Sequence, residues 1–147
     1  MKKILFTTLV IIFFLILGCS EDKENPVAPA PTPTTGTIGG VLSLPVGAGG
    51  DVTNTRVAIY QSYDDWLNDR VLVAVACGSG GAYTFSNVTP GSYYLDGWKD
   101  NNNNQIIDSG DFFGVYGSGT YPNYTLSPFS VAAGQTTAIN ATIFVVP

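Results

Sequence analysis

The sequence predicts an all-β protein whose strands form a sandwich, and three observations point to this fold class. Short runs rich in Val, Ile, Tyr and Phe recur from about residue 37 to residue 147, separated by Gly, Pro and Asn turns. Several runs alternate apolar and polar residues, as a strand with one buried face does. The region is roughly 110 residues long, which suits one domain with a single core. We therefore expect one β-sandwich domain over residues 37–147.

The apolar runs define the expected strands. The run at 71–77 is the most continuously apolar, so we expect it at the centre of a sheet. The runs at 82–85 and 92–98 flank a Thr-Pro-Gly turn, which predicts that these two strands pair with each other. The full set of expected strands is 37–44, 56–60, 71–77, 82–85, 92–98, 125–131 and 138–146.

One short segment, residues 62–69, has the character of a helix rather than a strand. Asp64 and Asp65 stand near its start, where negative charge favours a helix N-terminus. Trp66 and Leu67 follow, and they are expected to close an open end of the sandwich. The alternative is that Trp66 is an exposed platform for a ligand.

The first eighteen residues have the layout of a secretory signal peptide. Two lysines precede an apolar run at 4–17, which is too short for a membrane-spanning helix. The segment Ile-Leu-Gly-Cys that ends at Cys19 resembles the cleavage box of bacterial lipoproteins. This resemblance implies that residues 1–18 are removed and that Cys19 carries lipid, palmitate included, which anchors the mature chain to a membrane. The alternative is an ordinary signal peptide that is cut elsewhere.

Residues 19–36 are expected to be a tether between the lipidated cysteine and the domain. Four prolines, at positions 26, 29, 31 and 33, are interspersed with Val, Ala and Thr, a composition that favours an extended, semi-stiff chain. The acidic Ser20-Glu21-Asp22 that follows Cys19 resembles a surface-export signal of Bacteroidetes-type lipoproteins, or is simply a solvated linker. The expected location is the bacterial cell envelope, at the outer membrane, with the domain exposed at the surface.

Composition excludes several functions. Without Lys2 and Lys3, four basic residues remain against eleven acidic ones (6 − 2 = 4, and 4 − 11 = −7), a net charge that disfavours nucleic-acid binding. The chain has no histidine, which removes the commonest general base and imidazole metal sites. Cys77 has no partner once Cys19 is lipidated, and its apolar surroundings predict a buried thiol. No catalytic residues are expected, so the chain is predicted not to be an enzyme.

Residues 81–95 carry a longer pattern, G-x-Y-x-F-x-x-V-x-P-G-x-Y-x-L. This pattern resembles the carboxypeptidase-regulatory-like, transthyretin-like domains and their Cna-B and SdrD-B relatives. The resemblance implies a seven-stranded Greek-key β-sandwich with the transthyretin (prealbumin-like) arrangement. The alternation also predicts that Tyr83, Phe85 and Val88 point into the core, with Tyr93 and Leu95 following on the next strand.

An acidic loop follows at once and has the spacing of a calcium site. Its oxygen-bearing side chains fall at positions 1, 3, 5, 9 and 12, with a backbone carbonyl at position 7. Similar loops occur in SdrD-B-like and dockerin modules. Position 6 is Gln105 rather than Gly, so either Gln105 or a neighbouring Asn is expected at positive φ. The alternative is a simple Asn-rich turn. The predicted Ca²⁺ ligands are Asp100, Asn102, Asn104, Ile106, Asp108 and Asp111.

Aromatic residues crowd the Gly-rich stretch beyond this loop, where they either cover the edge of the sandwich or stack on a ligand. The residues proposed as ligand contacts are Trp66, Tyr116 and Tyr121. The predicted function is a lipid-anchored cell-envelope binding or structural module, stabilised by Ca²⁺, for adhesion to a glycan or surface protein or for scaffolding a surface complex.

Two other functions are weighed against this one. The first is a self-assembling surface-layer or filament subunit that pairs through its C-terminal strand, where Ile139, Ala141, Ile143 and Val145 are expected on one face. The second, less favoured, is a carbohydrate-active enzyme with a carboxylate pair drawn from the aspartates at 64, 65, 96 and 100.

Overall fold

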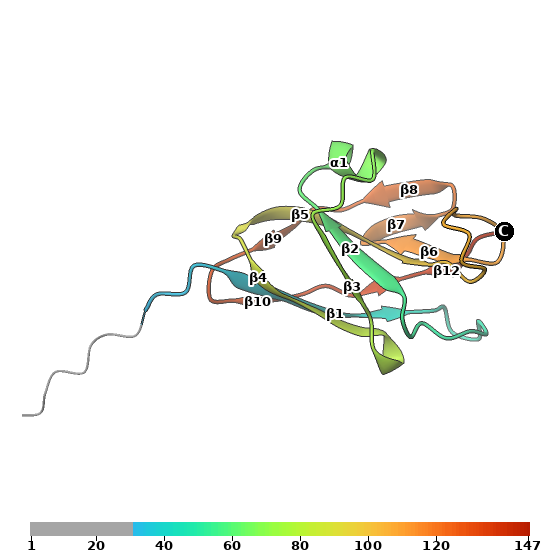
Figure 1. Ribbon diagram of the computed structural model, residues 1–147, viewed down its shortest axis with the longest axis horizontal. Coiled ribbons are helices and arrows are strands. Elements are labelled where there is room, and N and C mark those ends of the chain that lie inside the picture. Colours follow the sequence, from blue (N-terminus) through green and yellow to red (C-terminus); the bar gives the residue numbers. More distant parts are fainter. Residues whose placement is uncertain (1–30) are drawn as a thin grey trace, which may run out of the picture. The chain divides into compact units, whose positions relative to one another are not determined.

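The computed structural model describes residues 31–147, which form one compact unit (Figure 1). The predicted signal peptide, Cys19 and the tether as far as residue 30 lie outside the described residues. The described chain is almost entirely strand and loop, and the predicted all-β sandwich is confirmed. Both apolar clusters described below lie within this unit.

The smaller of the two main sheets is built around β1 (Gly36–Ser43). Strand β4 (Ala82–Val88) pairs with it in the antiparallel sense. Strands β10 (Thr136–Ala138) and β11 (Ala141–Thr142) pair with it in the parallel sense, one after the other along its length. The expected strand at 37–44 is therefore present and central.

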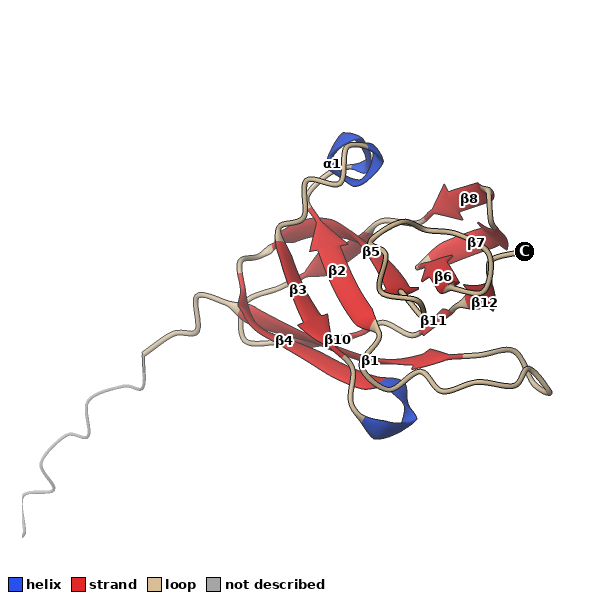
Figure 2. Cartoon of the chain, turned by 45° about the vertical axis from the view of Figure 1, so that its right-hand side comes forward, coloured by secondary structure: helices blue, strands red, loops and turns tan. Residues whose placement is uncertain are grey.

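The larger sheet has the order β12-β6-β5-β2-β3 (Figure 2). Strand β9 pairs with the first half of β5. Its neighbouring strands are all antiparallel. A separate two-stranded hairpin, β7-β8, follows β6 in the chain. The bounds are β2 (Arg56–Tyr60), β3 (Val73–Ala76), β5 (Gly91–Lys99), β6 (Phe112–Val115), β7 (Gly117–Thr120), β8 (Asn123–Leu126), β9 (Phe129–Val131) and β12 (Phe144–Val145).

The main core lies between these two sheets and takes alternate residues from β1, β2, β4, β5 and β9. On β4, the predicted inward set of Tyr83, Phe85 and Val88 is buried, which confirms that alternation. On β5, Tyr93 and Leu95 are buried in the same core. The Tyr83 hydroxyl donates to the carbonyl of Ile139, 2.5 Å away, so even this polar group is satisfied inside the core.

Two predictions about strand neighbours are wrong. The apolar run at 71–77 forms β3, which lies at the edge of the larger sheet, with Val73 41% exposed. The strands on either side of the Thr-Pro-Gly turn, β4 and β5, do not pair, because β4 belongs to the smaller sheet and β5 to the larger one. The turn therefore carries the chain from one layer to the other. A local pattern shows which residues are apolar, but not which strand lies beside which.

The C-terminal strand also departs from its prediction at one residue. Ile139, Ala141 and Ile143 are buried, as expected, but Val145 is 51% exposed. The chain leaves the smaller sheet after β11 and joins the edge of the larger sheet as β12, which breaks the alternation between them. Val146 is buried in place of Val145.

The short helical segment forms as α1 (Tyr63–Leu67). The Ser62 hydroxyl caps it by accepting from the backbone N–H of Asp65, at 3.0 Å. A 3-10 turn, η1 (Ser79–Gly81), precedes β4. Cys77 is 1% exposed and lies 2.7 Å from the Val52 carbonyl, so the predicted burial of this thiol is confirmed. Within residues 31–147, neither helical segment has the length and apolarity needed to cross a bilayer.

Candidate functional site: a groove on the outer face of the larger sheet

The outer face of the larger sheet carries a second apolar cluster, separate from the core between the sheets. Phe113 and Val115 of β6 point outward from the sheet into this cluster, together with Leu126 and Val146. Five partly buried side chains pack around them: Trp66, Tyr94, Trp98, Ile107 and Tyr124. The side chains of β5 alternate accordingly, with Tyr94, Asp96 and Trp98 on the face opposite the main core.

A groove of about 410 Å³ is hollowed into this outer face. Its floor is formed by residues of β2, β5 and β6. Helix α1 and Asp69, just beyond it, form one wall, and the acidic loop forms the other. The volume falls within the ~300–1,000 Å³ range of small-ligand sites. The lining residues are Arg56, Tyr60, Trp66, Leu67, Asp69, Asp96, Trp98, Gln105, Ile107 and Phe113.

Asp96 is the buried polar centre of the groove floor, with only 3% of its surface exposed. Its Oδ2 accepts hydrogen bonds from the Tyr60 hydroxyl, at 2.9 Å, and from the Trp66 indole N–H, at 3.1 Å. Its Oδ1 has no hydrogen-bond partner. Burial raises the pKa of the Asp96 carboxyl to about 6, although the donation from Tyr60 and the Arg56 charge act in the opposite direction.

Trp98 is held in the same way by a second buried carboxylate. Its indole N–H donates to Oδ2 of Asp111, at 3.0 Å, and Asp111 is completely buried. The backbone N–H of Asn101 donates to the other oxygen of Asp111, at 2.9 Å. Both tryptophans of the chain are thus fixed by their N–H groups while their rings line the groove.

The acidic loop between β5 and β6 closes on itself through its own side chains. The Asp100 carboxylate accepts from the backbone N–H groups of Asn104, at 3.2 Å, and Gln105, at 2.7 Å. The side-chain amides of Asn102 and Asn104 both donate to Asp108, at 3.1 and 2.6 Å. Four of the predicted calcium ligands therefore converge.

The backbone of this loop turns as the calcium hypothesis requires. Gln105 has φ 64° and Asn103 has φ 57°, so the predicted positive φ at position 6 or at a neighbouring Asn is confirmed. The oxygen-only donor set of carboxylates, amides and one carbonyl suits a hard cation such as Ca²⁺.

Asp111 differs from the other predicted ligands because it faces the protein. Both of its oxygens already accept a hydrogen bond, from Trp98 and from Asn101. Within residues 31–147, no three Asp, Glu, His or Cys side chains form a cluster that could hold a metal ion by themselves. A cation in this loop would therefore depend on the amide oxygens of Asn102 and Asn104 and on the Ile106 carbonyl as well as on the carboxylates.

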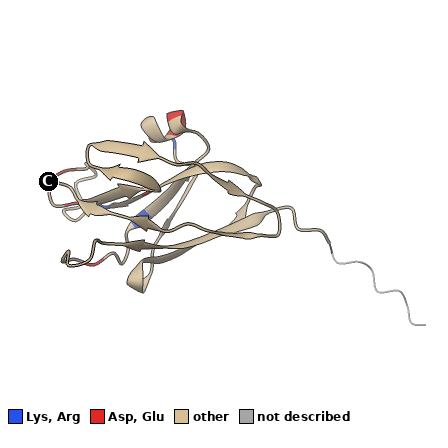
Figure 3. Cartoon of the chain, turned by 180° about the vertical axis from the view of Figure 1, so that it is seen from behind, with Lys and Arg blue, Asp and Glu red and all other residues tan. Residues whose placement is uncertain are grey.

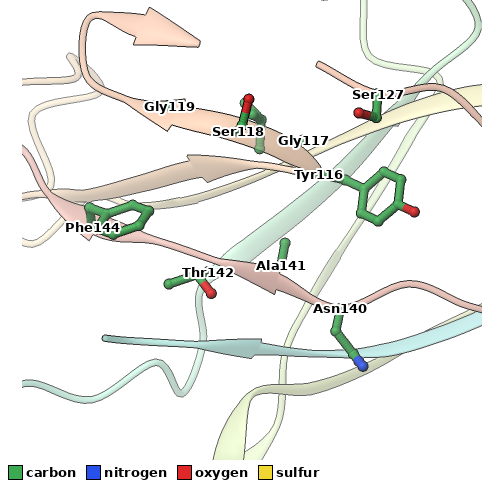
Figure 4. Close-up of a pocket in the computed structure, with 10 residues that line it drawn as sticks. Tyr116, Gly117, Ser118, Gly119, Ser127, Asn140, Ala141, Thr142 and Phe144 are labelled. Atoms are coloured by element: carbon green, nitrogen blue, oxygen red, sulfur yellow. The ribbon is translucent and has the colours of Figure 1, made fainter. Parts of the chain in front are cut away.

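The other proposed ligand-contact residues lie away from the groove. Tyr116 lines a different hollow, of about 420 Å³, between β7 and β11, with Phe144 at its other end (Figure 4). The Tyr116 ring also packs edge-on against Phe129, with ring centroids 5.7 Å apart. Tyr121 is 40% exposed at the β7-β8 turn. The structure thus brings Trp66 to the groove but leaves Tyr116 and Tyr121 elsewhere.

Charged residues of the described chain gather mainly on α1 and the loops (Figure 3). Asp64 and Asp65 pair with Arg70 beside the helix. Asp100 is occupied by the backbone of its own loop. These aspartates, which the enzyme hypothesis requires, are engaged in local structure, whereas Asp96 lies under the groove.

Sequence reasoning missed Tyr60, Asp96 and Trp98 as groove residues. The signal was present in β5, where three polar or aromatic side chains alternate with the core residues. Such a face indicates an outer surface with its own packing. The sequence could not show that Trp66 lies beside this face of β5, because α1 and β5 are 24 or more residues apart in the chain.

Comparisons with known proteins give limited information. No family model matches this sequence, and no curated protein matches it. Two solved structures are similar to this chain over much of its length. One is a minor pilin of Streptococcus agalactiae, with 11% identity, a TM-score of 0.45, and coverage of 79% of this chain and 47% of the pilin. The other is a proposed carbohydrate-binding protein of Pseudomonas aeruginosa, with 15% identity, a TM-score of 0.47, and coverage of 76% and 90%.

This chain thus spans about half the length of the pilin. Because both TM-scores are below 0.5, neither likeness bears on what this chain binds.

Proposed function

We propose that this chain is a lipid-anchored binding module of the bacterial cell envelope, which presents the Trp66–Trp98 groove to a glycan or surface protein. Its role is adhesion or the scaffolding of a surface complex, with no chemical step. The observation that carries the proposal is the fixing of both indole N–H groups by buried carboxylates. Rings held in this way need little further ordering when a ligand binds, which favours affinity.

The unpartnered oxygen of Asp96 adds to this argument. A buried acceptor without a donor costs about 1–3 kcal/mol, so packing alone does not account for it. Buried polar groups that reduce stability concentrate at functional sites. Here the carboxylate holds Tyr60 in the groove floor and Trp66 in its wall, which is a positioning role.

The groove is tested by a ligand screen that follows the NMR signals of the two indole N–H groups. Residues 31–147, labelled with ¹⁵N, are screened against a mixed library of saccharides, short peptides and small organic cations. A compound that shifts an indole signal in a saturable way is the expected result. A library that shifts neither indole signal would contradict a binding role for this face.

Calcium in the 100–111 loop is part of the proposal, with a structural role. The ligands would be Asp100, Asn102, Asn104, Asp108 and the Ile106 carbonyl, with Asp111 at the inner end. Bound calcium would supply positive charge that offsets the gathered carboxylates. At about ten times the dissociation constant, linkage gives ~1.4 kcal/mol of stabilisation, or several degrees in Tm. A thermal melt with EDTA and with ~10 mM calcium measures it.

The matched control for this melt is an Asp100→Ala/Asp108→Ala variant, which lacks two of the carboxylates. It should melt at one temperature whether or not calcium is present. Equal melting of the unaltered domain with EDTA and with calcium would reduce the loop to an Asn-rich turn.

The family and the anchor are also proposed. The β-sandwich is assigned to the carboxypeptidase-regulatory-like, transthyretin-like group, supported by the burial of Tyr83, Phe85 and Val88 in the core as that motif requires. Lipidation at Cys19 rests on the Ile-Leu-Gly-Cys segment. Labelling of cells with a palmitate analogue should mark the full chain but not a Cys19→Ser variant. Equal labelling of both would place the lipid elsewhere.

The self-assembly alternative retains one supporting observation. Strand β12 ends the larger sheet at the side opposite β3, so the C-terminal strand offers an edge for pairing. Sedimentation of residues 31–147, with and without calcium, separates the two functions. A strictly monomeric profile would argue against assembly through this edge.

A further inference from the structure

We propose that the groove binds a neutral saccharide, with a sugar ring lying against the ring surfaces of Trp66 and Trp98. This inference rests on the proposed binding function and names its ligand class. One side of a pyranose ring carries mainly C–H groups, which pack against an aromatic ring surface, while its hydroxyls point outward and need hydrogen-bond partners. A ligand of this kind requires an aromatic floor and a polar rim in the same site.

The aromatic part of the site is rigid. Trp66 is fixed through Asp96 and Trp98 through Asp111, so neither indole N–H is free to reach a ligand. What each ring offers to the groove is its carbon surface. Tyr60 is committed in the same way, since its hydroxyl donates to Asp96. The aromatic surface that these three residues form across the floor and the α1 wall is therefore apolar in its contacts, although each residue has a polar group.

The polar rim consists of planar groups that can still form hydrogen bonds. Arg56 Nη2 lies 3.4 Å from Asp69 Oδ1, a long and exposed ion pair that leaves donors and acceptors on both residues available. Gln105, on the acidic-loop wall, adds an exposed amide with both a donor and an acceptor. Guanidinium, carboxylate and amide groups together suit the hydroxyls of a sugar, each of which donates and accepts.

The charges of the groove favour a neutral ligand. Its single cation, Arg56, is faced by Asp69 and, from below, by Asp96. An anionic ligand would therefore meet two carboxylates and no unpaired cation. An organic cation would meet the Arg56 charge beside the exposed Asp69 carboxylate, and the carboxylate at the floor, Asp96, is 3% exposed with its Oδ1 shielded.

The experiment uses the fact that the chain has two tryptophans, both in the groove. Residues 31–147, labelled with ¹⁵N, are titrated separately with disaccharides of glucose, mannose, galactose and N-acetylglucosamine, and with choline and the tripeptide Gly-Tyr-Gly. We expect at least one disaccharide to shift both indole N–H signals in a saturable way. Choline and the tripeptide should leave both signals unchanged.

Variants locate the response. Trp66→Ala should raise the Kd for the active disaccharide about tenfold, which corresponds to ~1.4 kcal/mol, as followed by the remaining Trp98 signal. Tyr121→Ala, which alters an exposed aromatic away from the groove, should leave the Kd unchanged. If Trp66→Ala does not fold, Arg56→Gln keeps both rings and should still weaken binding about threefold to tenfold, through the lost rim donors.

Two results would overturn the inference, and the first of them leaves the proposed binding function intact. The first is a shift of the indole signals by choline or by the tripeptide but by no disaccharide. The second is disaccharide binding that neither Trp66→Ala nor Arg56→Gln weakens, which would place the sugar outside the groove. If no compound shifts either indole N–H signal, both the inference and the proposed binding function are overturned.

Discussion

The two faces of strand β5 differ in what they bury. On the inner face, Tyr93 and Leu95 join a core whose buried members are apolar and whose hydroxyls find carbonyl partners. On the outer face, Asp96 is buried with one oxygen unpartnered, and Trp98 is tied to a second buried carboxylate. Burial on the inner face stabilises the fold. On the outer face, buried carboxylates instead hold two aromatic rings in place. The proposed binding function therefore uses the face of β5 opposite to the one that stabilises the fold.

The inner face should show the largest effect on stability. Leu95→Ala removes a completely buried side chain from the core and should lower the free energy of unfolding by about 2–5 kcal/mol. Urea unfolding measures this difference. Leu72→Ala is the matched control, because Leu72 is 47% exposed beside the edge strand, and it should cost far less. Equal costs for the two variants would contradict the assignment of the inner face as the core.

The outer face should respond to pH in a direction set by Asp96. Its pKa is raised from 3.8 to about 6 in the folded chain, so the folded state holds this proton more tightly than the unfolded state does. The stability contributed by Asp96 is therefore fully present below pH 3.8 and is lost as the pH rises through about 6. A shift of about two pKa units corresponds to a loss of up to ~3 kcal/mol.

Asp96→Asn tests this direction, because the amide cannot ionise. The variant should be more stable than the unaltered domain at pH 7 and similar to it at pH 4, by urea unfolding at both pH values. Because other carboxylates titrate alike in both proteins, the difference isolates Asp96. A variant that is clearly less stable at pH 7 would show that the ionised carboxylate is well satisfied in its site.

The link between the groove and the acidic loop should give an intermediate effect. Trp98→Phe removes the indole donor to Asp111, which is completely buried, and should cost about 1–3 kcal/mol. It should also speed hydrogen exchange at the Asn101 amide, which donates to the same carboxylate. Trp66→Phe is the control and should leave Asn101 exchange unchanged. If the Asn101 amide exchanges at the same rate in both variants, Trp98 and the loop are not coupled.

The exposed ion pairs beside α1 should matter least. Arg70 contacts Asp64 and Asp65, but it is 53% exposed and solvent screens its charge. Arg70→Ala should therefore leave Tm unchanged within the error of a thermal melt. A distinct fall in Tm would show that α1 depends on these pairs rather than on its Ser62 cap and the packing of Trp66.

Local sequence patterns predicted the strand alternation but not the strand neighbours. The inward set of Tyr83, Phe85 and Val88 follows from period two alone, and the positive φ near Gln105 follows from the tight loop. The edge position of β3 and the separation of β4 from β5 depend on long-range pairing, which no local window contains. Apolar content misled most at 71–77, where a continuous run lies at a sheet edge.

The groove could be predicted only in part for the same reason. Trp66 could be identified from the sequence as a candidate because it is an aromatic residue in a polar segment. Its partner Asp96 lies 30 residues further along the chain, and Trp98 meets Asp111 across the whole acidic loop. Each pairing needs the sheet register that places β2, β5 and β6 side by side. Composition could not indicate that the chain's two tryptophans share one site.

The most direct test of the account is whether both indoles are held by their N–H groups while their rings stay open to the groove. Hydrogen exchange of the two indole N–H signals and acrylamide quenching of tryptophan fluorescence measure these two properties on residues 31–147. We predict slow exchange at both indole N–H groups together with efficient quenching. Exchange as fast as that of free indole, or rings that acrylamide does not quench, would contradict the account.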